Sequence, residues 1–138
     1  MNPRLLTIQA HHDQIAELCD LILQVAQQVG FDETTAYSCS LATAEACENI
    51  IHHGYTGEAD LPIAMTLNLS EEGSLIIELI DEAPAFNASE RPVQPEWSSD
   101  DPPVGGLGLQ IIHQVMDKVL YKRIGTQNIL TMIKHSPQ

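Results

Sequence analysis

The segment Glu45-Ala-Cys-Glu-Asn49 sets a carboxylate and a carboxamide four positions apart, in a stretch whose neighbours are mostly small or apolar. On an α-helix, positions four apart lie one turn from each other on the same face. A carboxylate there could act as a general base for a hydroxyl group, and a carboxamide oxygen is a suitable ligand for Mg²⁺. The alternative is a structural pair that hydrogen-bonds to the backbone.

Two later segments add features that a nucleotide requires. Asp81 ends the apolar run 75–80, where its carboxylate could accept a hydrogen bond from an exocyclic amine such as that of adenine, or could cap a turn. Gly105-Gly-Leu-Gly108 leads into a helix, and glycines before a helix N-terminus let the backbone approach an anion. This segment is neither a Walker A motif nor a dinucleotide fingerprint, and a structural turn is the alternative. Taken with the first segment, the two predict an ATP site.

The composition indicates a single acidic domain with an aliphatic core. The chain has 138 residues, of which 43% are hydrophobic and 4% aromatic. This length is enough for a hydrophobic core that needs no disulfides or metal ions to stabilise it. Its formal net charge of −13 disfavours nucleic acid as a partner, because phosphates would be repelled. With only six Lys and Arg residues, a bound nucleotide would need Mg²⁺ to mask its charge. A basic protein is a better candidate partner.

The cysteines and the hydropathy indicate the compartment. Cys19, Cys39 and Cys47 fall in predicted helices without CxxC or His-paired metal spacing, which predicts reduced, buried thiols. No apolar run approaches the roughly 18 residues of a membrane helix, and the N-terminus lacks the basic-then-apolar pattern of a targeting segment. We therefore expect a soluble cytoplasmic protein.

Hydrophobic periodicity predicts the order of helices and strands. Helices are expected over residues 11–29, 33–52 and 108–117, and strands over 5–9, 61–69, 74–80, 119–124 and 128–134. Asp32 is placed to cap the second helix. This order predicts an α+β two-layer sandwich, with the helices on one face of a mixed or antiparallel sheet.

The segment between Asp81 and Gly105 is a long loop with little periodicity, and it contains Pro92, Pro95, Pro102 and Pro103. Loops of that length inside a compact domain are uncommon unless they cover a site. We interpret it as a lid that ends at the Gly-rich segment. The alternative is a disordered insertion.

Together these segments resemble the GHKL (Bergerat-fold) ATPases and, more closely, the bacterial anti-sigma-factor serine/threonine kinases, which are RsbW-like switch-protein kinases. The N-box of the family is similar to Glu45-Ala-Cys-Glu-Asn49 with the following His53-Gly-Tyr55. The G1 box resembles Asp81-Glu-Ala-Pro-Ala-Phe86, and the G2 box resembles Gly105-Gly-Leu-Gly-Leu109. The resemblance covers roughly residues 5–135.

The resemblance implies a fold and a set of roles. The fold would be a single histidine-kinase-like ATPase domain over 1–138, with a mixed sheet covered on one face by about three helices and a lid over about 82–107. Glu45 would deprotonate the attacking hydroxyl, Asn49 would hold Mg²⁺ between the nucleotide phosphates, and Asp81 would bind the adenine amine. The remaining nucleotide-binding positions would be Ala83, Phe86, Gly105, Gly106, Leu107, Gly108, Leu109 and Asn128.

The sequence departs from the family at Ala83, where the G1 box normally has Gly. A methyl group there would narrow the adenine pocket and restrict the backbone. The lid is acidic as well, with Glu90, Glu96, Asp100 and Asp101 beside the single cation Arg91.

The resemblance implies an ATP-dependent protein serine/threonine kinase of a partner-switching system. It would phosphorylate a STAS-type anti-anti-sigma protein and sequester a sigma factor or another target, and the resemblance also suggests a homodimer. The alternative is a non-enzymatic anti-sigma-like binding module with weak or lost nucleotide binding. The pair His52-His53 is not interpreted as a metal site, because adjacent helical residues point to different faces, and the pair His11-His12 is interpreted as a solvated helix start.

Overall fold

A computed structural model of the chain describes residues 2–58, 60–90 and 106–137. Its strands are β1 (Arg4–Gln9), β2 (Pro62–Leu69), β3 (Leu75–Asp81), β4 (Lys118–Ile124) and β5 (Gln127–Lys134). Its helices are α1 (His12–Gln28), α2 (Glu33–Asn49), the π-helical turn η1 (Ile50–Gly54) and α3 (Gly106–Val115). Each predicted element is present, with bounds within a few residues of the expected ones.

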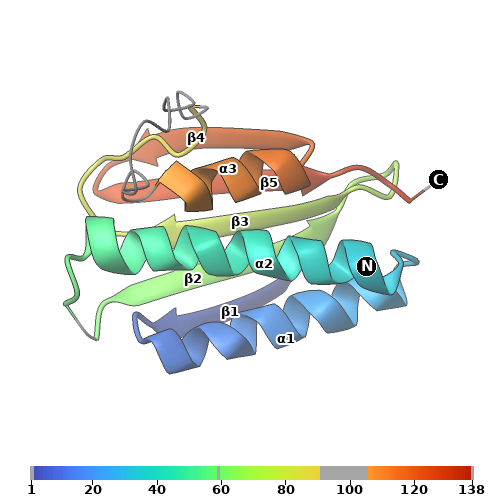
Figure 1. Cartoon of the computed structure of the whole chain (residues 1–138), viewed down its shortest axis with the longest axis horizontal. Helices are drawn as coiled ribbons and strands as arrows, with labels where there is room; N and C mark the ends of the chain where they lie inside the picture. The colour runs from blue at the N-terminus through green and yellow to red at the C-terminus, as the bar shows by residue number, and fades with distance from the viewer. Residues whose placement is uncertain (1, 59, 91–105, 138) are drawn as a thin grey trace, which may run out of the picture.

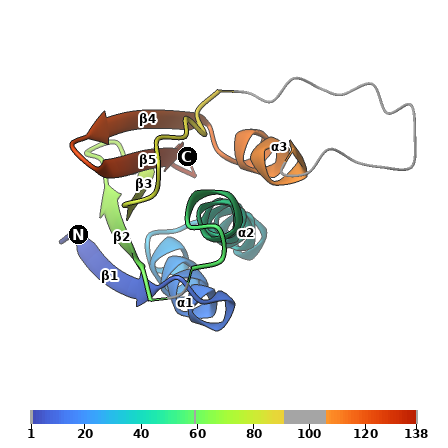
Figure 2. The same cartoon turned by 90° about the vertical axis from the view of Figure 1, so that its left-hand side faces the viewer.

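The five strands form one sheet in the order β1-β2-β3-β5-β4, and every neighbouring pair is antiparallel. All three α-helices cover the same face of this sheet (Figures 1 and 2). The α+β two-layer sandwich is therefore confirmed, but the mixed sheet is wrong. Two helices, α1 and α2, connect β1 to β2, so the chain reverses direction between these neighbours. The single helix α3 makes β4 parallel to β3, but β5 lies between them.

The core fills the space between the helices and the sheet. α1 buries one face along its length, and alternating residues of β2 and β3 are buried on the sheet face that the helices cover (Figure 2). These buried side chains are Ile15, Leu18, Ile22, Val25 and Ala26 from α1, Ile63, Met65 and Leu67 from β2, and Leu75, Ile77 and Leu79 from β3. Because almost all of them are aliphatic, the prediction of an aliphatic core is confirmed.

α2 lies between the other two helices and has little amphipathic character, as its many small residues suggest. Asp32 caps its N-terminus, accepting a hydrogen bond from the Thr35 backbone N–H at 2.7 Å. The hydrogen bonds from Thr35 lower the pKa of Asp32. The predicted helix over 33–52 is α-helical only to Asn49, after which the backbone N–H of Tyr55 donates to the carbonyl oxygen of Ile50 at 2.7 Å. This five-residue spacing is that of a π-helix, a rare form that often occurs at functional sites.

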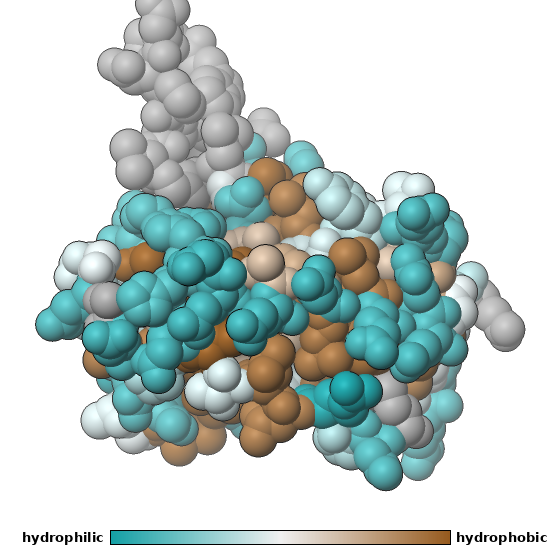
Figure 3. Space-filling model, turned by 90° about the horizontal axis from the view of Figure 1, so that it is seen from below, coloured by the Kyte–Doolittle hydropathy of each residue, from teal (hydrophilic) through white to brown (hydrophobic). Residues whose placement is uncertain are grey.

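The three cysteines are free thiols in the helical layer. Burial raises the pKa of Cys39 to about 11, and burial also raises the pKa of Cys47. Within the described ranges, no helix combines the length and apolar character that crossing a membrane would require. Figure 3 shows the face on the side of α1 and β1, where apolar side chains form small groups among polar ones.

Candidate nucleotide site

Glu45 and Asn49 lie on the side of α2 that faces the beginning of α3. A Cβ atom added at Gly108 would lie 3.0 Å from the Glu45 Oε2 and 3.6 Å from the Asn49 Oδ1. A side chain at position 108 would therefore crowd the Glu45 carboxylate and contact the Asn49 amide. The structure thus brings the first and third predicted segments together, and glycine at position 108 leaves the space beside the pair open.

The side chain of Asn49 contains a hydrogen-bond donor that no described residue satisfies. Its Nδ2 atom is buried and has no hydrogen-bond partner among the described residues. Leaving a buried amide donor unpaired costs about 1–3 kcal/mol, so this group calls for a partner such as water, an ion or a ligand. An anionic oxygen at this point would accept from Nδ2, while Oδ1 is the ligand type that Mg²⁺ prefers. These residues therefore fit a magnesium-bound phosphate, and within the described residues the Asn49 Nδ2 does not make the bond that the backbone-bonded alternative requires.

Asp81 occupies the end of β3, and its side chain is buried. Its Oδ1 accepts hydrogen bonds at 2.9 Å from the Ala83 backbone N–H and from the Asn128 Nδ2. Asp81 thus caps the turn that follows β3 and also lines the pocket described below. The two interpretations of this residue are compatible.

Asn128 joins β5 to the segment after β3. Its Nδ2 also donates to the carbonyl oxygens of Ala83 at 3.0 Å and Pro84 at 3.1 Å. Its Oδ1 accepts from the Tyr121 hydroxyl at 2.6 Å and from the Arg123 Nη1 at 3.1 Å. The amide therefore holds the wall of the pocket, and its direct bond to the Asp81 Oδ1 orients that carboxylate.

Ala83 points its methyl group at the end of α2. A Cβ atom added at Gly54 would lie only 2.8 Å from the Ala83 Cβ. Ala83 is buried, and its φ is not positive, so alanine fits this backbone without strain. The Ala83 methyl group thus lies close to Gly54 at the pocket, and the narrowing of an adenine pocket stays a prediction.

A pocket lies between the end of α2, the segment after β3 and the last hairpin. Its volume is about 40 Å³, well below the roughly 300–1,000 Å³ of typical ligand pockets. Its walls include apolar side chains together with the polar side chains of Asn49, His53, Asp81, Tyr121 and Asn128. The lining residues are Ala46, Asn49, Ile50, His53, Gly54, Asp81, Ala83, Pro84, Phe86, Ala88, Tyr121, Asn128 and Leu130.

The other predicted positions are placed as follows. Phe86 lines the pocket and is half exposed, while Leu109 packs against the edge of the core. Gly106 and Leu107 are the first residues of α3. Gly105 lies outside the described residues, as do Arg91, Glu96, Asp100 and Asp101 of the predicted lid.

Sequence reasoning assigned no role to several residues at the pocket. His53 lines it, whereas the adjacent His52 bonds to Glu48 instead, so the two histidines point apart as expected. Tyr121 and Arg123 hold Asn128. The feature that could have identified Tyr121 and Arg123 is the pairing of β4 with β5. This pairing places Arg123 opposite Asn128.

The sequence matches the histidine kinase-like ATPase domain over residues 8–134. The chain belongs to this family. The resemblance to the GHKL ATPases is thereby confirmed, and the described parts of the G1 and N-box segments lie on one pocket of this histidine kinase-like ATPase domain.

Curated relatives carry the name serine-protein kinase RsbW. The protein from Bacillus licheniformis is 26% identical over 100 residues, covering 69% of this chain and 62% of the relative. That from Halalkalibacterium halodurans is 27% identical over 122 residues, covering 85% of this chain and 74% of the relative. The match thus spans less than two thirds of the first of these relatives.

Solved structures show the same fold. The RsbU and RsbW domains of a Mycobacterium tuberculosis protein superpose with a TM-score of 0.66 at 16% identity, covering 98% of this chain and 32% of that one. The histidine kinase domain of a blue-light activated kinase from Erythrobacter litoralis gives a TM-score of 0.55 at 18% identity, covering 90% and 60%. At these identities the likeness concerns the fold alone.

Proposed function

We propose that this chain is an ATP-dependent protein serine/threonine kinase of a partner-switching system. The observation that carries the proposal is the convergence of Glu45 and Asn49 on Gly108, with a buried Asn49 Nδ2 that has no hydrogen-bond partner in the part of the chain that the structure describes. Family membership and the name of the curated relatives support the same activity.

Asn49 and the start of α3 would hold the phosphates. The Asn49 Oδ1 would ligate Mg²⁺, and its Nδ2 would donate to a phosphate oxygen. Gly106 and Gly108 would let the backbone of α3 approach the phosphates at a helix N-terminus. When bound, Mg²⁺ neutralises phosphate charge, which matters in a chain of net charge −13.

Glu45 would act on the protein substrate. Its carboxylate takes the proton of a serine or threonine hydroxyl, and the hydroxyl oxygen forms a bond to the γ-phosphorus as the bond to the β–γ bridging oxygen breaks. ADP leaves, and the proton remains on Glu45 until solvent removes it. Positioning by α2 and α3 supplies most of the catalysis, as is usual for phosphoryl transfer.

Asp81 would accept a hydrogen bond from the adenine amine, with Asn128 fixing the orientation of its carboxylate. The pocket of about 40 Å³ is too small for a purine, so adenine enters only if the wall between Ala83 and Phe86 moves outward. The predicted lid over about 82–107 stays part of the proposal, and its residues 91–105 lie outside the described residues.

The proposed protein substrate is a STAS-type anti-anti-sigma protein, and the sequestered target is a sigma factor or another regulator. A homodimer is part of this proposal, as is a cytoplasmic location. Among the described residues the edge strand β1 pairs with β2 alone, and Leu5 on it is 69% exposed, which leaves room for a partner there. Light scattering after size-exclusion chromatography measures the oligomeric state.

Thermal unfolding with and without Mg-ATP tests the nucleotide site. Binding to the folded state alone raises stability by about 2.7 kcal/mol at a hundredfold excess over Kd. We expect this shift in the wild type and not in Asn49→Ala, whereas Glu45→Gln should retain it. Transfer of labelled phosphate to a serine-bearing STAS-type protein should be lost in Glu45→Gln.

Two outcomes would contradict the proposal. Phosphorylation that survives Glu45→Gln would show that Glu45 is not the base. The absence of any shift at millimolar Mg-ATP, together with tight binding of the STAS-type protein, would leave the non-enzymatic binding module as the function.

A further inference from the structure

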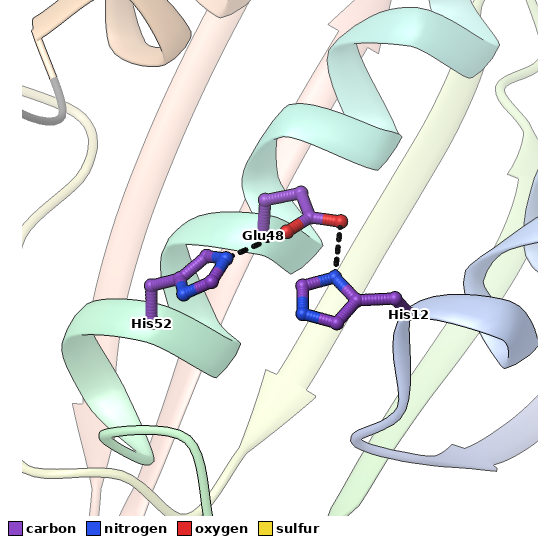
Figure 4. A group of neighbouring side chains, drawn as sticks. All are labelled: His12, Glu48 and His52. Atoms are coloured by element: carbon purple, nitrogen blue, oxygen red, sulfur yellow. Dashed lines mark hydrogen bonds and ion pairs between the residues drawn. The ribbon is translucent and has the colours of Figure 1, made fainter.

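Three side chains outside the nucleotide site converge at the end of α2. His12 opens α1, Glu48 lies in the last turn of α2, and His52 lies in η1 (Figure 4). The His12 Nδ1 lies 2.8 Å from one oxygen of the Glu48 carboxylate, and the His52 Nε2 lies 3.1 Å from the other. The two imidazole rings are 5.0 Å apart between centroids. A single carboxylate therefore holds two imidazoles that belong to different elements.

From this convergence we propose a binding site for a divalent transition metal of the zinc class. Two imidazole nitrogens and one carboxylate oxygen form a donor set that Zn²⁺ uses in proteins, with the fourth position left to water. Their ligand atoms all lie within 4.8 Å of one another. Tetrahedral Zn²⁺ with bonds near 2.0–2.1 Å places its ligand atoms about 3.3 Å apart, so small ring rotations would complete the site.

The surroundings favour a cation. The chain carries a net charge of −13, which raises the local concentration of metal ions at its surface. The side chains of His12 and His52 are 58% and 56% exposed, so a hydrated ion can reach them. Among residues 2–58, 60–90 and 106–137, this is the one group of three such side chains with ligand atoms that close together.

The π-helical turn contributes to the geometry. Glu48 and His52 are four residues apart across the junction between α2 and η1, and both side chains turn toward the start of α1. His12 comes from 36 residues earlier in the chain, so a bound ion would tie α1 to the junction. Glu48 directly precedes Asn49, and the ion would therefore also fix the end of the helix that carries the phosphate-site residues.

Metal titration of the nucleotide-free protein tests the proposal. Untagged, EDTA-treated protein is titrated with Zn²⁺ at pH 7.5 against a chromogenic chelator, and with Co²⁺ while its visible absorption is recorded. We expect one equivalent of Zn²⁺ per chain, a Co²⁺ spectrum with imidazole coordination, and a rise in melting temperature with Zn²⁺. His12→Asn, Glu48→Gln and His52→Asn should each weaken Zn²⁺ binding at least about tenfold.

Matched variants keep the test specific. Glu48→Gln retains hydrogen-bond acceptance at the same place but loses the anionic ligand, which separates a metal site from a hydrogen-bonded cluster. His11→Asn removes the adjacent histidine, which pairs with Asp60 instead, and should bind Zn²⁺ like the wild type. Unfolding without metal verifies that each variant is folded. Zn²⁺ binding that the three variants leave unchanged, or no binding at micromolar Zn²⁺, would overturn the proposal.

Discussion

Gly54→Ala and Ala83→Gly, made singly and together, test whether the Ala83 methyl fills the space beside the end of α2. A Cβ at position 54 would lie 2.8 Å from the Ala83 Cβ, against about 3.5–4.0 Å for a relaxed carbon contact. Neither atom can swing aside. The backbone of Ala83 donates to Asp81 and accepts from Asn128 and Arg123, so the segment is held at three points.

Each variant has an expected cost. Overpacking at a rigid site costs about 1–3 kcal/mol, of which about 0.5–1 kcal/mol is recovered because alanine replaces glycine within a helical turn. Gly54→Ala alone should therefore destabilise the protein by about 1–2 kcal/mol. Ala83→Gly should cost about 1–2 kcal/mol, from a lost buried methyl and a more flexible unfolded chain. In the Ala83→Gly background, Gly54→Ala should become stabilising by about 0.5–1 kcal/mol.

Urea unfolding followed by far-UV circular dichroism measures the four stabilities, provided that the four m-values agree. The wild type, the two single variants and the double variant form a double-mutant cycle. This cycle should give an interaction energy of about 1–3 kcal/mol between positions 54 and 83. If Gly54→Ala costs the same in both backgrounds to within about 0.5 kcal/mol, the two methyl groups do not meet, and the account of the narrowed pocket is wrong.

Three further outcomes can be measured on the same protein. Ala83→Gly should bind Mg-ATP more tightly than the wild type in a calorimetric titration, because the pocket wall loses a methyl group; unchanged or weaker binding would show that another group limits entry. The pKa of Asp32 is lowered by its hydrogen bonds with Thr35, so its charge stabilises the folded state above its ordinary pKa, and this contribution is lost as the pH falls through the lowered value. The stability difference between the wild type and Asp32→Asn, which keeps a cap that cannot titrate, should therefore shrink in acid, and a constant difference in urea midpoints would contradict the assignment. Because burial raises the pKa values of Cys39 and Cys47, iodoacetamide at pH 8 should label them far more slowly in the folded than in the urea-unfolded protein by mass spectrometry; equal rates would exclude burial as the cause.

Local patterns in the sequence predicted most of the fold. Alternation over 61–69 and helical spacing over 11–29 come from residues that share one face, and β2 and α1 follow them closely. The position of β5 between β3 and β4 has no such local signal, since it depends on which strands meet across the whole chain. The π-helical turn also went unpredicted, because a shift from four-residue to five-residue hydrogen bonding leaves the hydrophobic pattern almost unchanged.

For the site, helical spacing predicted the Glu45–Asn49 pair, and the approach of Gly108 agrees with the predicted Gly-rich helix start. The binding roles of these residues stay predictions. The bonds of Asn128 to the segment after β3 could not be predicted, because they require the register of β3 against β5. Likewise, His12 meets Glu48 only because α1 and α2 pack antiparallel.

The insertion of β5 also affects how the protein is made. A nascent chain that has exposed only residues up to 126 has both β3 and β4 but lacks the strand that bonds to each of them. Its sheet has a gap between β3 and β4, and Asp81 lacks Asn128 as its partner. The side of the pocket that Asp81 and Asn128 line is therefore assembled only when the ribosome has released residues 127–134. A ribosome that stalls before this point should expose a nascent chain with open strand edges, which is a form that chaperones bind and proteases degrade.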